Sequence, residues 1–155
     1  MQKLQDNNFT ISIIRTPIVY GKGVKANILS LVKLVDKVPI LPFGNIPNKR
    51  SMVYIGNLCE MVDTLCTKKM DGIFLAGDDE AVSTTRLIEI IARAKGKKIK
   101  LFKFSLLPLL LRMVKPSYYK RLYKSLEIDN RITKKRLGFD NSVSMEDGIK
   151  YMLTL

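Results

Sequence analysis

The chain has 155 residues, 46% of them hydrophobic, so it is long enough to bury one core and is expected to form a single unit over residues 1–155. It carries 27 lysines and arginines against 14 acidic residues, a formal charge of +13. That excess favours an anionic neighbour such as a phosphate group, a nucleic acid or an acidic membrane surface, with solubility alone as the alternative. The sequence has no histidine, which excludes Ser-His and Cys-His catalysis, and we expect no metal site.

The two cysteines and the first residues bear on the compartment. Cys59 and Cys66 lie on nearly the same face of an expected helix but about two turns apart, too far for a disulfide. We therefore expect free, buried thiols in a reducing cytoplasm. Residues 1–6 contain no apolar segment of the kind that directs export, which agrees with a cytoplasmic location.

Strand and helix signals alternate along the chain. The β-branched run Phe9–Val19 predicts a buried strand, and apolar residues at helical spacing predict a helix over 26–36. Further strands are predicted over 39–43, 50–55, 72–76 and 99–104. Helices are predicted over 57–67, 83–96, 106–114, 115–136 and 144–153, with N-caps at Ser83 and Ser144. This alternation indicates an α/β fold.

Between the first strand and helix stands GKGVKA, residues 21–26, which spells the G-x-G-x-x-A of a dinucleotide loop. Such a loop needs a central strand and an acidic residue about 20 positions on for the ribose. Pro17 lacks the N–H that a central strand would donate, and no Asp or Glu occurs between Val38 and Cys59. We conclude that the loop does not bind a dinucleotide.

A different resemblance covers nearly the whole chain in order. The stretch IIRTPIVYGKG resembles the R-x-x-x-V-Y-G-P-G segment of the extended short-chain dehydrogenases, the NAD-dependent epimerase/dehydratase family of UDP-glucose 4-epimerase-like enzymes. Three later stretches resemble its following segments: LPFGNIPNKRSMVYIGNLCEMVDTLC, IFLAGDDEAVSTTRLIEIIARAKGK and RLGFDNSVSMEDGIKYML. The resemblance implies the last sheet strands of an extended Rossmann-type epimerase together with its small α/β substrate-binding domain.

The family's glycine-rich loop and its catalytic Tyr-x-x-x-Lys lie upstream of the position that Arg15 matches. None of the 6 tyrosines of this chain has a lysine four residues later. The chain thus resembles the C-terminal half of an epimerase without its NAD-binding half. We expect no catalytic residue here, and we expect the chain alone neither to bind NAD nor to turn over a nucleotide sugar.

The resemblance implies substrate-binding roles for four residues. Arg50 matches the arginine that holds the diphosphate, a role suited to a guanidinium that gives paired hydrogen bonds, although a lone arginine is often only solvated. Asn27 matches a contact to the diphosphate or sugar, with helix capping as the alternative. Phe43 and Gly44 match the pair beside the uridine, with a core aromatic and a turn as the alternative.

Two more groups are implied less directly. Pro17, Tyr20 and Gly21 match the turn whose backbone approaches the nicotinamide end of NAD. Their implied role is to set the backbone conformation there, not to take part in the chemistry. Arg121 and Ser125 fall near a second phosphate contact of some members, without a basis for choosing between them. The implied partners are a UDP-sugar or related nucleotide sugar, the absent N-terminal half and a second copy of the chain.

The positive charge leaves two alternatives of another class. One is a nucleic-acid-binding module, in which Tyr118, Tyr119 and Tyr123 alternate with cations, but the sequence contains no recognised nucleic-acid-binding motif. The other is a peripheral role at an anionic membrane surface, suggested by the leucines and cations of Phe104–Lys124. Its apolar run is too short to cross a bilayer.

Overall fold

The computed structural model describes residues 9–25 and 27–154, so the expectation for residues 1–6 falls outside it. The strands are β1 (Ser12–Arg15), β2 (Ile18–Tyr20), β3 (Ile40–Leu41), β4 (Met52–Tyr54), β5 (Gly72–Leu75) and β6 (Lys100–Leu101). The helices are α1 (Asn27–Lys37), α2 (Ile55–Lys68), α3 (Thr84–Ala94), α4 (Leu107–Val114), α5 (Pro116–Tyr123), α6 (Arg131–Leu137) and α7 (Met145–Leu153). The fold is α/β, as predicted.

The strands form three parallel pairs rather than one sheet. β1 pairs with β5, β2 with β4, and β3 with β6. The single strand predicted over Phe9–Val19 is wrong, because the chain breaks between Arg15 and Ile18 and its two parts take different partners. The break falls at Pro17, which has no N–H to continue a ladder.

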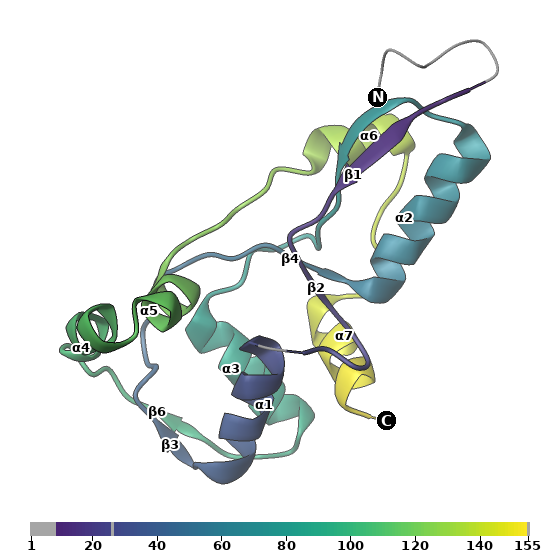
Figure 1. Cartoon of the computed structure of the whole chain (residues 1–155). Helices are drawn as coiled ribbons and strands as arrows, with labels where there is room; N and C mark the ends of the chain where they lie inside the picture. Colours follow the sequence, from purple (N-terminus) through teal and green to yellow (C-terminus); the bar gives the residue numbers. More distant parts are fainter. Residues whose placement is uncertain (1–8, 26, 155) are drawn as a thin grey trace.

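The molecule is elongated, with one hydrophobic cluster toward each end (Figure 1). The first cluster lies among α1, α3 and α7, where α3 alone buries six residues. The N-cap predicted for α3 is confirmed, since Ser83 Oγ accepts a hydrogen bond from Arg86 N at 3.0 Å. The second cluster joins α2, β4, β5 and α6 through Phe74 and Leu137, both fully buried.

A buried carboxylate ties these parts together. Asp78, only 9% exposed, accepts hydrogen bonds from the Tyr20 hydroxyl at 2.7 Å, from Asn57 Nδ2 at 2.9 Å and from the backbone N–H of Tyr54 at 3.1 Å. Burial raises the pKa of the Asp78 carboxyl, and the three hydrogen bonds oppose that rise. The sequence places Asp78 in an acidic turn and gives no sign of its burial.

The helix predicted over 115–136 is also wrong. α5 ends at Tyr123, and an extended stretch leads to α6. Backbone hydrogen bonds hold this stretch beside the start of β4: Leu126 N donates to Lys49 O at 2.8 Å, and Ser51 N donates to Leu126 O at 2.9 Å. Pairing with a distant segment therefore replaces helical hydrogen bonds here.

Both cysteines are exposed, which corrects the expectation of buried thiols. α2 buries one side through Met61 and Leu65, four positions apart, and Cys59 and Cys66 lie off that side. The thiols are free, as expected. Within the described ranges, no helix combines the length and apolarity that crossing a membrane requires.

Candidate functional site

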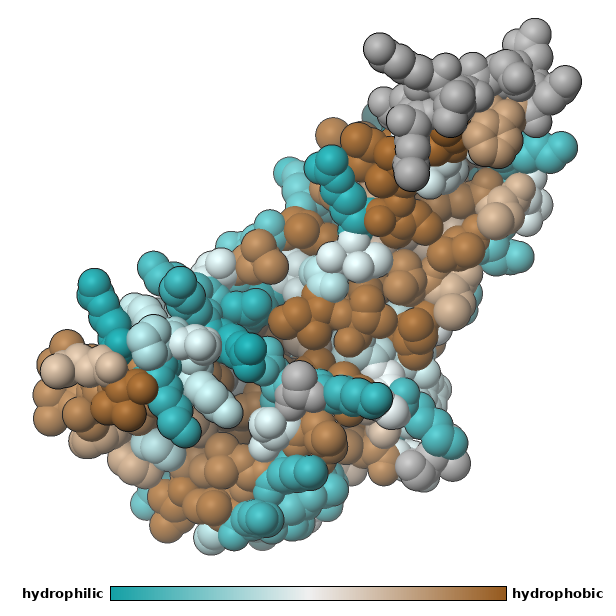
Figure 2. Space-filling view, viewed as in Figure 1, coloured by the Kyte–Doolittle hydropathy of each residue, from teal (hydrophilic) through white to brown (hydrophobic). Residues whose placement is uncertain are grey.

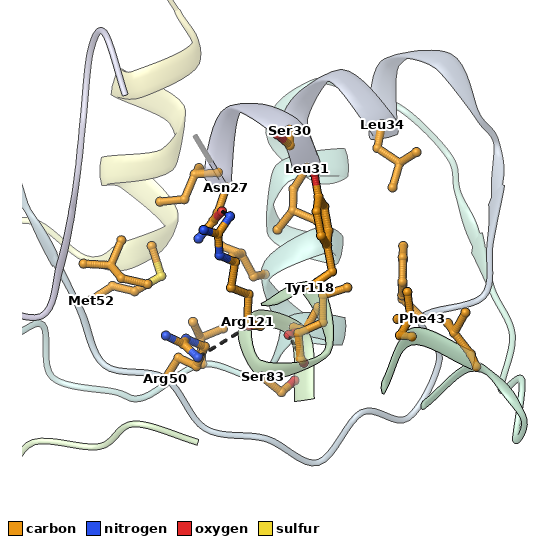
Figure 3. A pocket seen from close by; sticks show the side chains of 18 residues that line it. Asn27, Ser30, Leu31, Leu34, Phe43, Arg50, Met52, Ser83, Tyr118 and Arg121 are labelled. Atoms are coloured by element: carbon orange, nitrogen blue, oxygen red, sulfur yellow. Dashed lines mark hydrogen bonds between the residues drawn. The ribbon is translucent and has the colours of Figure 1, made fainter. Parts of the chain in front are cut away.

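A pocket of about 490 Å³ opens among α1, α3, α4 and α5 (Figure 3). Most of its wall is apolar, with Ile28, Leu31 and Leu87 contributed by α1 and α3. Leu107 and Leu111, one turn apart on α4, also line it. The pocket is thus a largely hydrophobic cavity of the size that small-molecule sites usually have.

Arg50 stands at one end of the pocket just before β4. Its backbone is held by an antiparallel bridge to Val82, with the two N–H···O bonds at 2.9 and 3.0 Å. Its Nη1 donates to the backbone oxygen of Lys124 at 3.0 Å and to that of Arg121 at 3.4 Å. The predicted diphosphate arginine therefore lines the cavity, and its guanidinium is anchored on neutral oxygens.

Asn27 and Arg121 stand at the same end. Arg121 Nη1 donates to Asn27 Oδ1 at 2.8 Å, which joins the last part of α5 to the start of α1. Figure 3 shows Asn27, Arg121 and Arg50 together at one end of the pocket, with Phe43 at the other. Segments far apart in the sequence, near residues 27, 50 and 121, thus build one polar corner.

The pair Phe43-Gly44 divides between two roles. Phe43 lines the pocket and packs against the first hydrophobic cluster. Gly44 does not line it; its N–H donates to Phe102 O at 3.0 Å, and a Cβ there would lie 2.7 Å from the carbonyl carbon of Phe102. Glycine is required by this close backbone approach, so Gly44 positions Phe43 without itself facing the cavity.

The three residues predicted for the cofactor side are also absent from the pocket wall. Pro17 and Gly21 flank β2, and the Tyr20 side chain is 1% exposed. Burial and the neighbouring Asp78 carboxylate raise the pKa of the Tyr20 hydroxyl, which stays a hydrogen-bond donor. The Tyr20 side chain thus belongs to the core. Only the backbone of this turn is available for the predicted approach to the nicotinamide end of NAD.

Sequence reasoning missed the contribution of α4 to the wall and named only Arg121 from α5. Thr84 Oγ1 donates to Leu122 O at 2.7 Å and holds α5 over the start of α3. Of the two looser candidates, Arg121 faces the cavity, whereas Ser125 Oγ accepts from Lys49 N at 3.0 Å outside it. The only sequence signal for the wall is the spacing of Leu107 and Leu111.

No protein-family model matches the chain. It is 36% identical over 154 residues to a UDP-glucose 4-epimerase of Vibrio cholerae, which covers 94% of this chain and 46% of the relative. Its structure superimposes on UDP-N-acetylglucosamine 4-epimerase from Bacillus cereus with a TM-score of 0.70 at 18% identity, covering 96% of this chain and 47% of the other. For the Thermus thermophilus UDP-glucose 4-epimerase complexed with NAD, the TM-score is 0.66 at 17% identity, with 95% and 46% covered.

The predicted resemblance is confirmed. The chain is similar in sequence and fold to UDP-glucose 4-epimerase and to NAD-dependent epimerases and dehydratases with the extended short-chain dehydrogenase fold. It spans about half the length of the relatives it matches.

Proposed function

We propose that this chain is the C-terminal, nucleotide-sugar-binding half of an NAD-dependent sugar epimerase or dehydratase, inactive until an NAD-binding half completes it. The observation that carries the proposal is the convergence of Arg50, Arg121 and Asn27 on one end of an apolar pocket. The similarity to UDP-glucose 4-epimerase supports a UDP-sugar or related nucleotide sugar as the ligand.

The polar corner suits a diphosphate. Each guanidinium presents five N–H donors, and the hydrogen bonds described for Arg50 and Arg121 use Nη1 in both. Their acceptors are neutral oxygens, and among the described residues no carboxylate pairs with either arginine. Phosphate oxygens make shorter and stronger charge-assisted bonds than neutral carbonyls, so a diphosphate would displace them.

The remaining wall suits the rest of the ligand. Phe43 lies at the far end of the cavity from the arginines, where it offers an aromatic face to a base (Figure 3). We assign the uridine to that end and leave Gly44 as the residue that positions Phe43. Because the diphosphate links the uridine to the sugar, the sugar then lies past the arginines, on the side of Asn27.

Docking of the NAD-binding half would use the end that carries β1. β1 pairs only with β5 among the described strands, which leaves its second edge unpaired. A groove of about 440 Å³ runs between β1 and α2, lined by Ile14, Val62 and Leu65. We propose that parallel strands of the NAD-binding half complete this region and bring NAD to the turn at Pro17, Tyr20 and Gly21. Alone, the chain would self-associate there.

The proposed location is the cytoplasm. Two exposed free thiols fit a reducing compartment, where neither is driven into a disulfide.

Substitution of Arg50 tests the ligand assignment in a single chain that joins an NAD-binding half to this one. Arg50→Ala should weaken UDP-sugar binding by about 1.5–3 kcal/mol, the range for hydrogen bonds to charged groups, while NAD affinity stays unchanged. Arg50→Lys should recover only part of the loss because it cannot give paired hydrogen bonds. Titration calorimetry with each ligand measures both affinities.

Lys49→Ala is the matched control, because Lys49 is adjacent and 64% exposed in its side chain. It should leave both affinities unchanged. Equal losses for NAD and UDP-sugar in Arg50→Ala, or no loss for either, would contradict the assignment. Tight, saturable NAD binding by the isolated chain would contradict the proposal that a second half supplies the cofactor site.

A further inference from the structure

Helix α4 is apolar on two sides, and only one of them faces the protein. Leu107 and Leu111 point into the pocket wall. The adjoining side carries five apolar residues at positions i, i+3, i+4, i+7 and i+8, which we call the outer face of α4. Its members and exposed fractions are Leu106 (59%), Leu109 (56%), Leu110 (48%), Met113 (75%) and Val114 (74%). Figure 2 shows this apolar surface at the end of the molecule where α4 lies in Figure 1.

The charge around this face has one sign. Residues 91–126 contain no Asp or Glu. Four exposed cations lie on α4, on α5 and at the residue after each of these helices: Arg112, Lys115, Lys120 and Lys124. Among the described residues none of these four pairs with a carboxylate. An exposed apolar helix face in a stretch whose charges are all positive is complementary to a layer whose interior is hydrocarbon and whose surface is anionic.

Other occupants fit less well. Protein-protein interfaces are depleted in lysine, whereas three of these four cations are lysines. The NAD-binding half would pair with β1, which lies at the opposite end of the molecule from α4 (Figure 1). With eight residues α4 is about 12 Å long, far short of the roughly 30 Å of a hydrocarbon core, so it can lie in a membrane surface but not cross it.

We propose that the outer face of α4 docks the protein on an anionic lipid bilayer. Leu109, Leu110 and Met113 enter the boundary between headgroups and acyl chains, and Lys115 and Lys120 contact lipid phosphates. Because Leu107 and Leu111 of the same helix line the pocket, docking holds the pocket next to the membrane surface.

Vesicle flotation of the full chain tests the proposal, since floating vesicles separate bound protein from aggregates. Recovery with vesicles of phosphatidylcholine and phosphatidylglycerol should exceed recovery with phosphatidylcholine alone by at least about tenfold at low salt, and high salt should reduce it. The double variant Leu110→Glu, Met113→Glu should lose binding. Met113→Ser with Val114→Ser, which adds no charge, should weaken it in the same direction.

The matched control places two glutamates on exposed positions elsewhere, Ile132→Glu in α6 and Tyr151→Glu in α7, which are 74% and 54% exposed. It has the same net charge as the Leu110→Glu, Met113→Glu variant and should float like the unaltered chain. Equal recovery from neutral and anionic vesicles would overturn the proposal, and so would equal loss in control and test variants.

A second copy of the chain and a free anion are the remaining alternatives. Sedimentation velocity without lipid reveals a dimer, and a dimer that Leu110→Glu with Met113→Glu dissolves would overturn the proposal in favour of self-association. Inorganic phosphate at matched ionic strength should not compete with the vesicles more than chloride does. If it abolished flotation, the cations would be a phosphate site and the lipid proposal would fail.

Discussion

Helices α3 and α4 begin from similar sequence patterns and end in opposite environments. Both have an apolar stripe at helical spacing, yet α3 buries six of its 11 residues and α4 buries none of its 8. α3 packs against α1 and α7 in the first hydrophobic cluster. α4 contacts mainly α5 and covers the pocket with one side only. An amphipathic pattern thus shows where apolar residues lie on a helix, but not whether anything covers them.

The largest effect expected from this comparison concerns stability. Ile88 of α3 is fully buried, so Ile88→Ala should lower the free energy of unfolding by about 4 kcal/mol through lost burial and the cavity left behind. Leu110→Ala on the outer face of α4 should change it by less than about 0.5 kcal/mol. Urea denaturation followed by circular dichroism measures both. A comparable loss for Leu110→Ala would mean that α4 is covered in solution.

Asp78 gives the next largest effect, since it is a polar group held within the same packed region. Asp78→Ala should cost about 3 kcal/mol, because it leaves the Tyr20 hydroxyl and the Tyr54 N–H buried without their acceptor. Urea midpoints at neutral pH measure this loss. Asp79→Ala, in which an exposed neighbour is removed, should cost much less.

The raised pKa of Asp78 also predicts a pH dependence. The folded state binds a proton on the Asp78 carboxyl more tightly than the unfolded state does. Proton binding by Asp78 therefore adds to the free energy of unfolding. This contribution is complete below the unfolded pKa of about 3.9 and is lost as the pH rises through the folded pKa. Asp78→Asn removes the titrating group, so the difference in unfolding free energy between variant and unaltered chain should shift in favour of the variant as the pH rises above about 4. A pH-independent difference would contradict the raised pKa.

The smallest effect concerns the ends of the two helices. Ser83 caps α3 through its side chain, whereas the N-cap residue of α4, Leu106, makes no such bond. Ser83→Ala should therefore cost about 1 kcal/mol, and Leu106→Ala should leave stability nearly unchanged. Thermal denaturation of the two variants measures the difference. Equal shifts in melting temperature would contradict a stabilising role of the Ser83 cap.

Features that depend only on neighbours along the chain can be predicted from the amino-acid sequence. Helical spacing and an N-cap serine are local properties, so α3 and its start at Ser83 could be predicted closely. The α/β alternation could be predicted for the same reason. The motif resemblance also selected Asn27, Phe43 and Arg50, which the structure brings to one pocket.

Which of these local features come into contact depends on how distant segments pack. Asp78 is buried because Tyr20, 58 residues away, and Asn57, 21 residues away, donate to it, and no local pattern encodes that encounter. The strand break at Pro17 became a change of partner only because β5 pairs with the strand before it and β4 pairs with the strand after it. Arg121 reaches Asn27 across 94 residues because α5 folds back over α3. Burial and hydrogen bonding between distant segments depend on the whole packing, whereas periodicity and capping depend on a few consecutive residues.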